Sequence, residues 1–213
     1  QPFYGRCSEV SYLNDGDVFY LTEKGLKATE NVQTPEFEPL LGSYEEQDYG
    51  RFSHLMLKEI HDQPVSLSNV MSGRISADGL TVELGGLDLT PEEILGLDRI
   101  NIVACGSAFF ASQIGASYLR EMTKIPVQAF RASEFPADCV CSDNSLTIGV
   151  SQSGETKDTL DALQKAKQNG SQITSFCNVI GSTMSRLAKN GAYLHAGPEF
   201  SVASTKAVTN MVA

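Results

Sequence analysis

Basic residues are scarce in this chain of 213 residues: 16 lysines and arginines stand against 26 aspartates and glutamates, which gives a formal net charge of −10. A field of that sign repels nucleic-acid phosphates and anionic membrane surfaces, so neither nucleic acid nor a membrane is an expected partner. The sequence also lacks any apolar run that approaches the ~20 residues needed to cross a bilayer. It does not open with a basic stretch followed by an apolar one, so nothing in it resembles a signal peptide.

Cysteine is also sparse, and its number, five, is odd. Cys105 and Cys177 each lie in or at the end of an apolar run, which favours free buried thiols in a cytoplasmic protein over a disulfide framework. Cys139 and Cys141 are separated by a single residue, whereas redox and zinc motifs favour two intervening residues. The three histidines share no metal-ligand spacing. We therefore expect neither a metal nor another cofactor.

The residues that are present indicate a globular protein, with 41% hydrophobic and 8% aromatic content and enough length for one good-sized domain and an appendage. Short strand patterns at Val18–Leu21 and Leu26–Ala28 are too few to form a core of their own, so we interpret them as the end of a larger domain. A linker is predicted over residues 33–49, which contain two prolines and many acids.

The pattern changes to a helical one at residue 50. Across residues 50–73, apolar side chains recur at three-to-four spacing, which is typical of an amphipathic helix. Pro64 lies inside this stretch, and proline removes a backbone donor and clashes with the preceding turn. The stretch therefore predicts two helices that meet at Pro64.

A repeating unit of strand and helix begins near Asp98. Nearly continuous apolar runs alternate with helical stretches, which predicts an α/β fold with a parallel sheet covered by helices on both faces. About five strands suggest a flavodoxin-like order, in which ligands bind at the carboxyl ends of the strands. The last ten residues also predict a helix with no closing signal, so we interpret the chain as a piece of a larger protein. The five expected strands are Ile100–Cys105, Val127–Phe130, Leu146–Val150, Ile173–Cys177 and Tyr193–His195.

One strand end, in the sequence VSQSGET, is unusually rich in small polar residues. Val150 ends the apolar run, and Ser151, Gln152 and Ser153 follow before Gly154 and a helix that starts near Thr156. Backbone N–H groups at a helix N-terminus lack partners, and together with the helix dipole they favour an anion such as phosphate. The alternative is an ordinary cap, in which Ser153 or Thr156 satisfies the helix and no ligand binds.

Two further segments have the same character. The strand that ends at Cys105 is followed by Ser107, and the stretch Val202–Lys206 again places small hydroxyls at a helix start. Three such segments, if they converge, would form the rim of a sugar-phosphate pocket. Lys206 would either neutralise the phosphate or lie in solvent. The sequence lacks the glycine-rich patterns of P-loop NTPases and of dinucleotide-binding folds, which disfavours both classes.

Several short motifs together resemble one enzyme family. These motifs are ACGS at Ala104–Ser107, SQSGET at Ser151–Thr156, CNV at Cys177–Val179, VASTKA at Val202–Ala207 and the helical KEIHDQP at Lys58–Pro64. They are similar to motifs of the glucosamine-6-phosphate synthases, the glutamine:fructose-6-phosphate aminotransferases. The resemblance covers roughly residues 45–213 as the first sugar-isomerase (SIS) subdomain. It also implies that residues 1–32 are the last strands of a glutaminase domain, and that residues 50–213 are the SIS subdomain with its N-terminal helices at 50–73.

The resemblance implies a set of residues that contact the sugar phosphate, and no catalytic residue in this segment. Ala108 departs from the family motif, which has serine there, so one possible contact to the sugar is absent. The implied substrate-binding residues are Ser107, Ser151, Gln152, Ser153, Thr156, Val202 and Ser204.

The resemblance also implies an activity for the intact protein. Such enzymes convert fructose 6-phosphate and glutamine into glucosamine 6-phosphate and glutamate, using a glutaminase domain and a second SIS subdomain that this segment lacks. We therefore expect this piece to bind the sugar phosphate without turnover, and the intact protein to be a cytoplasmic homodimer. Two alternatives stay open: a non-catalytic SIS module that senses sugar phosphates, and a flavodoxin-like binder of a nucleotide or flavin.

Overall fold

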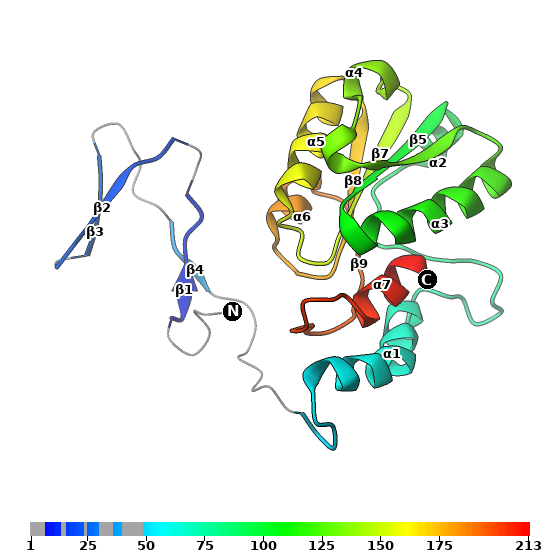
Figure 1. The fold of residues 1–213 in the computed structure, drawn as a ribbon. Coiled ribbons are helices and arrows are strands. Elements are labelled where there is room, and N and C mark those ends of the chain that lie inside the picture. The colour runs from blue at the N-terminus through cyan, green and yellow to red at the C-terminus, as the bar shows by residue number, and fades with distance from the viewer. Residues whose placement is uncertain (1–6, 14–15, 24, 30–35, 40–48) are drawn as a thin grey trace. The chain divides into compact units, whose positions relative to one another are not determined.

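The computed structural model describes residues 7–13, 16–23, 25–29, 36–39 and 49–213, and the chain divides into two compact units, Gln1–Asp48 and Tyr49–Ala213 (Figure 1). In the first unit, β2 (Phe19–Thr22) pairs antiparallel with β3 (Gly25–Ala28), which confirms the two strands predicted there. The two-residue strands β1 (Glu9–Val10) and β4 (Glu38–Pro39) form a second antiparallel pair.

The second unit is built on a five-stranded sheet in the order β6-β5-β7-β8-β9, and every pairing in it is parallel. This is the predicted flavodoxin-like order, in which β6, the second strand of this sheet along the chain, lies at one edge. Helices cover both faces of the sheet (Figure 1). The strands are β5 (Arg99–Ala104), β6 (Val127–Arg131), β7 (Ser145–Ser151), β8 (Gln172–Cys177) and β9 (Gly191–Tyr193). The helices are α1 (Leu55–Met71), α2 (Pro91–Leu95), α3 (Gly106–Thr123), α4 (Ala137–Val140), α5 (Lys157–Gln168), α6 (Thr183–Ala188) and α7 (Lys206–Val212), with a 3-10 turn at Ala132–Glu134.

The core consists of two apolar clusters on opposite faces of the sheet. Successive strand side chains point to opposite faces, so Ile102 of β5 packs with α3, while its neighbour Val103 packs with α5 and α6. Every residue of β7 is buried, as expected for a central strand covered on both sides. Among the described residues, no helix combines the length and the apolar character needed to cross a membrane.

The prediction that Pro64 divides the first helical stretch was wrong, because α1 runs unbroken from Leu55 to Met71. Proline has no N–H to donate to the carbonyl four residues earlier, which here belongs to Ile60. The side chain of Gln63 replaces that donor, since its Nε2 donates to the Ile60 carbonyl oxygen at 3.0 Å. Gln63 Oε1 accepts a hydrogen bond from Thr209 of α7, so the same side chain also fastens α1 to the C-terminal helix.

The last strand was predicted at Tyr193–His195, but β9 spans Gly191–Tyr193. Gly191 has φ +142°, and a Cβ atom there would lie 1.9 Å from the Ser175 carbonyl oxygen of β8. The strand therefore starts at the only residue type that permits this close approach. It ends before His195, whose left-handed backbone, at φ +50°, turns the chain out of the sheet.

Candidate functional site

The site lies at the carboxyl edge of the sheet, where two neighbouring strands are each followed by a helix. β5 and β7 are paired in parallel with Ala104 opposite Val150, so the residues that follow them, Cys105 and Ser151, come side by side. α3 begins directly after Cys105, and α5 begins at Lys157 after a five-residue loop. Two helix N-termini therefore open at the same edge of the sheet.

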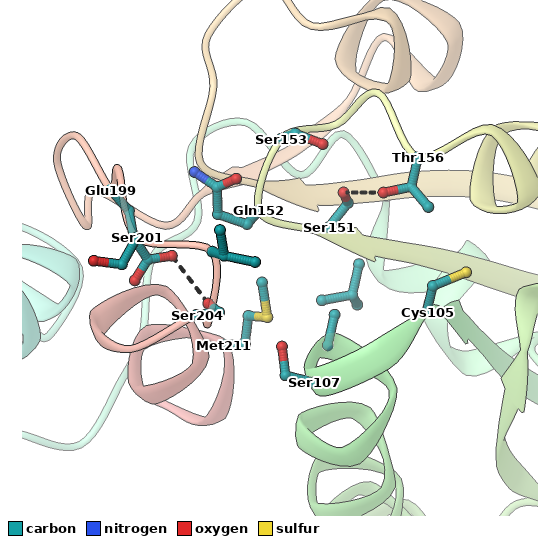
Figure 2. Close-up of a pocket in the computed structure, with 13 residues that line it drawn as sticks. Cys105, Ser107, Ser151, Gln152, Ser153, Thr156, Glu199, Ser201, Ser204 and Met211 are labelled. Atoms are coloured by element: carbon teal, nitrogen blue, oxygen red, sulfur yellow. Dashed lines mark hydrogen bonds between the residues drawn. The ribbon is translucent and has the colours of Figure 1, made fainter. Parts of the chain in front are cut away.

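A cavity of about 200 Å³ occupies this edge (Figure 2). In the close-up, Ser151 and Thr156 lie on one side and Glu199 and Ser201 on the other, with Ser107 on α3 below them. Thirteen described residues line it, and these include all seven residues named from the sequence: Ser107, Ser151, Gln152, Ser153, Thr156, Val202 and Ser204. The other six lining residues are Cys105, Ala108, Val150, Glu199, Ser201 and Met211.

The loop after β7 is held by its own hydroxyl groups. Ser151 is buried, and its Oγ accepts from the Gly154 amide at 3.1 Å and lies 3.1 Å from Thr156 Oγ1. Ser153 Oγ accepts from the Glu155 amide at 3.1 Å. Gly154 has φ +67°, and a Cβ there would lie 2.2 Å from Ser182 Oγ, so glycine is required both for the turn and for the packing.

The helix N-termini at the cavity are not closed by their own cap residues. Thr156 is the N-cap residue of α5 and Cys105 that of α3, and within the described part of the chain neither side chain makes a capping hydrogen bond. The alternative in which Thr156 is an ordinary side-chain cap therefore does not match the geometry. First-turn amides that no cap side chain satisfies carry the positive end of the helix dipole toward the cavity.

The opposite side of the cavity is the segment before α7, with Glu199 at its centre. Glu199 Oε1 accepts from the amides of Thr205 and Ala207 at 2.8 and 3.2 Å, so it caps α7 from outside the helix. Glu199 Oε2 accepts from Ser204 Oγ at 3.0 Å (Figure 2). Because the Ser204 hydroxyl donates its proton to Glu199, its oxygen could act toward a ligand only as an acceptor.

Lys206 neither faces the cavity nor lies in solvent, so both predictions made for it were wrong. Its side chain is buried, with Nζ 3.7 Å from Asp62 Oδ2 of α1. The lining residues among those described are uncharged except Glu199, and none is basic. An anion bound here would therefore rest on neutral hydrogen-bond donors. The described residues also contain no group of three or more side chains that could hold a metal ion.

A family model decides what this architecture belongs to: the SIS domain model matches residues 93–213, more than half of the chain. The chain belongs to the SIS domain family. The SIS match begins before β5 and runs to the end of α7, so it contains both helix N-termini and the segment with Glu199. α1 lies outside it.

Relatives of this SIS domain with longer chains carry the name that the motifs suggested. The chain is 41% identical over 215 residues to a glutamine–fructose-6-phosphate aminotransferase (isomerizing) of Chlorobaculum tepidum, covering 99% of this chain and 35% of the relative. A protein of the same name from Bacteroides thetaiotaomicron is 39% identical over 216 residues, with the same coverage. The chain thus spans about a third of the length of the curated relatives it matches.

Solved structures agree on the fold. The C-terminal domain of glucosamine-fructose-6-phosphate aminotransferase from Francisella tularensis superimposes with a TM-score of 0.68 at 34% identity, covering 76% of this chain and 46% of that one. A tagatose-6-phosphate ketose/aldose isomerase from Escherichia coli gives a TM-score of 0.60 at 19% identity, covering 75% of this chain and 45% of that one, and this likeness shows the fold alone. The predicted resemblance to this enzyme family is confirmed.

Proposed function

We propose that this chain is the sugar-phosphate-binding part of a glutamine–fructose-6-phosphate aminotransferase. The intact protein would make glucosamine 6-phosphate from fructose 6-phosphate and glutamine. The observation that carries the proposal is that three separate segments bring small hydroxyls to one cavity beside two helix N-termini. The names of the longer relatives support it.

The phosphate is assigned to the loop after β7. Ser151, Gln152, Ser153 and Thr156, with the first-turn amides of α5, offer neutral donors to a dianion, and each hydrogen bond to a charged group is worth about 1.5–3 kcal/mol. Millimolar affinity needs only about −4 kcal/mol, so a few such bonds hold a metabolite without a basic side chain.

The sugar is assigned to the opposite side of the cavity. Ser204 and Val202 would contact it there, and Ser107 from α3, with Glu199 fixing the direction of the Ser204 hydroxyl. Ala108 lines the cavity without a hydroxyl, so it offers the sugar no hydrogen bond. The cavity of about 200 Å³ is smaller than the roughly 300–1,000 Å³ of sites for drug-sized ligands, which favours a hexose phosphate over a flavin nucleotide.

The proposal extends to the intact protein. Residues 1–32 would be the end of its glutaminase domain, residues 33–49 a linker, and residues 50–213 the first of two SIS subdomains. The whole would be a glutamine amidotransferase that acts as a cytoplasmic homodimer. Assaying the full-length protein for glucosamine 6-phosphate tests this extension. Full-length protein that binds fructose 6-phosphate but forms no product would favour the sensing module instead.

Calorimetric titration of the chain tests the site itself. We expect fructose 6-phosphate and glucosamine 6-phosphate to bind with millimolar or tighter affinity, and fructose without phosphate to bind far more weakly. Flavin mononucleotide should give no signal. Binding of the flavin with no response to either sugar phosphate would contradict the proposal.

A cysteine among the lining residues gives an independent measurement, and its Sγ lies 3.7 Å from Thr159 Oγ1 of α5. Cys105 is partly exposed and lines the cavity, whereas Cys139 is exposed outside it. Fructose 6-phosphate should therefore slow alkylation of Cys105 and leave alkylation of Cys139 unchanged. Equal rates with and without the ligand at Cys105, under conditions where calorimetry detects binding, would place the bound ligand elsewhere.

A further inference from the structure

Glu59 is a buried carboxylate that the cavity does not contain. It lies on α1, which precedes the segment matched to the SIS domain, and only 3% of its surface is exposed. Taking a carboxylate out of water is costly unless hydrogen bonds compensate for the lost hydration. The partners of Glu59 therefore indicate what it does.

All hydrogen bonds that the described residues give to the carboxylate of Glu59 come from the segment 199–205. Oε1 accepts from the amides of Phe200 and Ser201 at 2.7 and 3.2 Å. Oε2 lies 3.5 Å from Thr205 Oγ1, which donates to Glu199 Oε1 at 2.9 Å. Together Glu59 and Glu199 receive hydrogen bonds from six donors of residues 200–207.

This segment forms one side of the cavity, which we call the loop wall: Glu199, Ser201, Val202 and Ser204. Its amides at Phe200 and Ser201 are tied to α1, not to the sheet. The strand-end side, formed by Ser151, Gln152, Ser153 and Thr156, has no contact with Glu59 among the hydrogen bonds of the described residues. The two sides of the cavity are therefore held by different parts of the fold.

We propose that Glu59 is a positioning residue that sets the loop wall for the sugar, so that α1 is a functional part of the site. This inference rests on the proposed function. Because the phosphate is assigned to the strand-end side, a change at Glu59 should weaken binding of the sugar phosphate and spare binding of inorganic phosphate. A general loss of structure would instead weaken the binding of both ligands.

Two variants at Glu59 separate the reach of the side chain from its charge. Glu59→Asp keeps the charge but is one methylene shorter, so it should lose the hydrogen bonds from the Phe200 and Ser201 amides. We expect its affinity for fructose 6-phosphate to fall about tenfold or more. Glu59→Gln keeps an acceptor oxygen at full reach and should stay within about twofold of the unchanged chain. The affinity for inorganic phosphate should agree within about twofold among the unchanged chain and the two Glu59 variants. The matched control is Glu93→Asp, which shortens another hydrogen-bonding glutamate, in the cap of α2, and should change neither affinity.

Amide hydrogen exchange tests the contact without any ligand. Exchange at Phe200 and Ser201 should accelerate in Glu59→Asp and remain slow in Glu59→Gln. Unchanged exchange in Glu59→Asp, or equal losses for fructose 6-phosphate and inorganic phosphate, would overturn the inference. If the unchanged chain binds no fructose 6-phosphate, the proposed function fails instead, and the exchange rates still decide whether Glu59 holds the loop.

Discussion

At the scale of single residues, the hydroxyls after β7 differ in what they do for the folded chain. Ser151 Oγ accepts from the buried Gly154 amide, so Ser151→Ala would leave that amide without its acceptor and destabilise the protein by about 1–3 kcal/mol. Thr156 Oγ1 contacts only the Ser151 hydroxyl among the hydrogen bonds of the described residues. Thr156 is therefore the cleaner position at which to separate binding from stability.

We expect Thr156→Val to reduce affinity for fructose 6-phosphate about tenfold or more, because valine keeps the shape and removes one donor to the phosphate. The melting temperature should change little. Thr123→Val is the matched control, since that hydroxyl donates to the Leu119 carbonyl at the far end of α3. Calorimetry and thermal unfolding measure the two effects. Unchanged affinity in Thr156→Val would remove the hydroxyl from the phosphate site.

Gly154 gives a second prediction at this scale. Gly154→Ala combines a left-handed backbone at φ +67° with a Cβ 2.2 Å from Ser182 Oγ, whereas Gly181→Ala has a similar φ of +71° and nothing within 4 Å of its Cβ. Backbone strain alone is worth about 1 kcal/mol, so Gly181→Ala should lose about that much stability and Gly154→Ala clearly more. Urea unfolding measures both. Equal losses would mean that Ser182 moves aside at no cost.

At the scale of elements, α1 depends on the side chain of Gln63, which supplies the hydrogen-bond donor that Pro64 lacks. Gln63→Glu keeps the length of the side chain but cannot donate to the Ile60 carbonyl, so we expect a loss of about 0.5–1.5 kcal/mol in unfolding free energy. Gln113→Glu makes the same charge change on the exposed face of α3 and should lose much less. Chemical unfolding compares the two variants. A loss in Gln63→Glu no larger than in the control would show that α1 tolerates Pro64 without Gln63.

The elements that sequence patterns predicted well are those whose burial is set by local periodicity. β5, β7 and β8 coincide closely with their apolar runs, because strands covered on both faces carry mostly apolar side chains. α1 and β9 were mispredicted because their bounds depend on particular side-chain and backbone contacts that the apolar pattern does not record. Gln63 supplies a donor that proline lacks, and Gly191 permits an approach of β9 to Ser175 that a side chain would block.

At the scale of the whole molecule, the same difference between local patterns and particular contacts separates the site residues that were predicted from those that were missed. The strand-end residues were predictable, because parallel topology places the carboxyl ends of β5 and β7 together. The stretch Val202–Lys206 was recognised by its small hydroxyls at a helix start, and the family resemblance then named Val202 and Ser204 within it, whereas Glu199 and Ser201 were missed. Glu59 was also missed, since a glutamate on an amphipathic helix has no local mark of burial. Its partners lie more than 140 residues further along the chain.

The pH dependence of stability should reveal a group outside the site. His195 is exposed by its surface area, but partial desolvation by its neighbours, and to a lesser degree the nearby Arg74 charge, lowers its pKa below its ordinary value of 6.5. Between the folded pKa and 6.5 the unfolded chain binds more protons, so this contribution to stability is present above pH 6.5 and is lost as the pH falls through that window.

His195→Asn should remove this slope, because asparagine does not titrate and tolerates the left-handed backbone at φ +50°. Urea unfolding of both proteins between about pH 7.5 and 5.5 measures the difference, and the unchanged chain should lose more stability on acidification than the variant. Asp78 and Glu93, whose pKa values hydrogen bonds lower from 3.8 and 4.5, titrate below this range and do not enter the comparison. The other two histidines are common to both proteins and cancel. Parallel curves for the two proteins would mean that His195 titrates alike in the folded and unfolded chains, and that its neighbours, Arg74 included, leave its protonation unaffected.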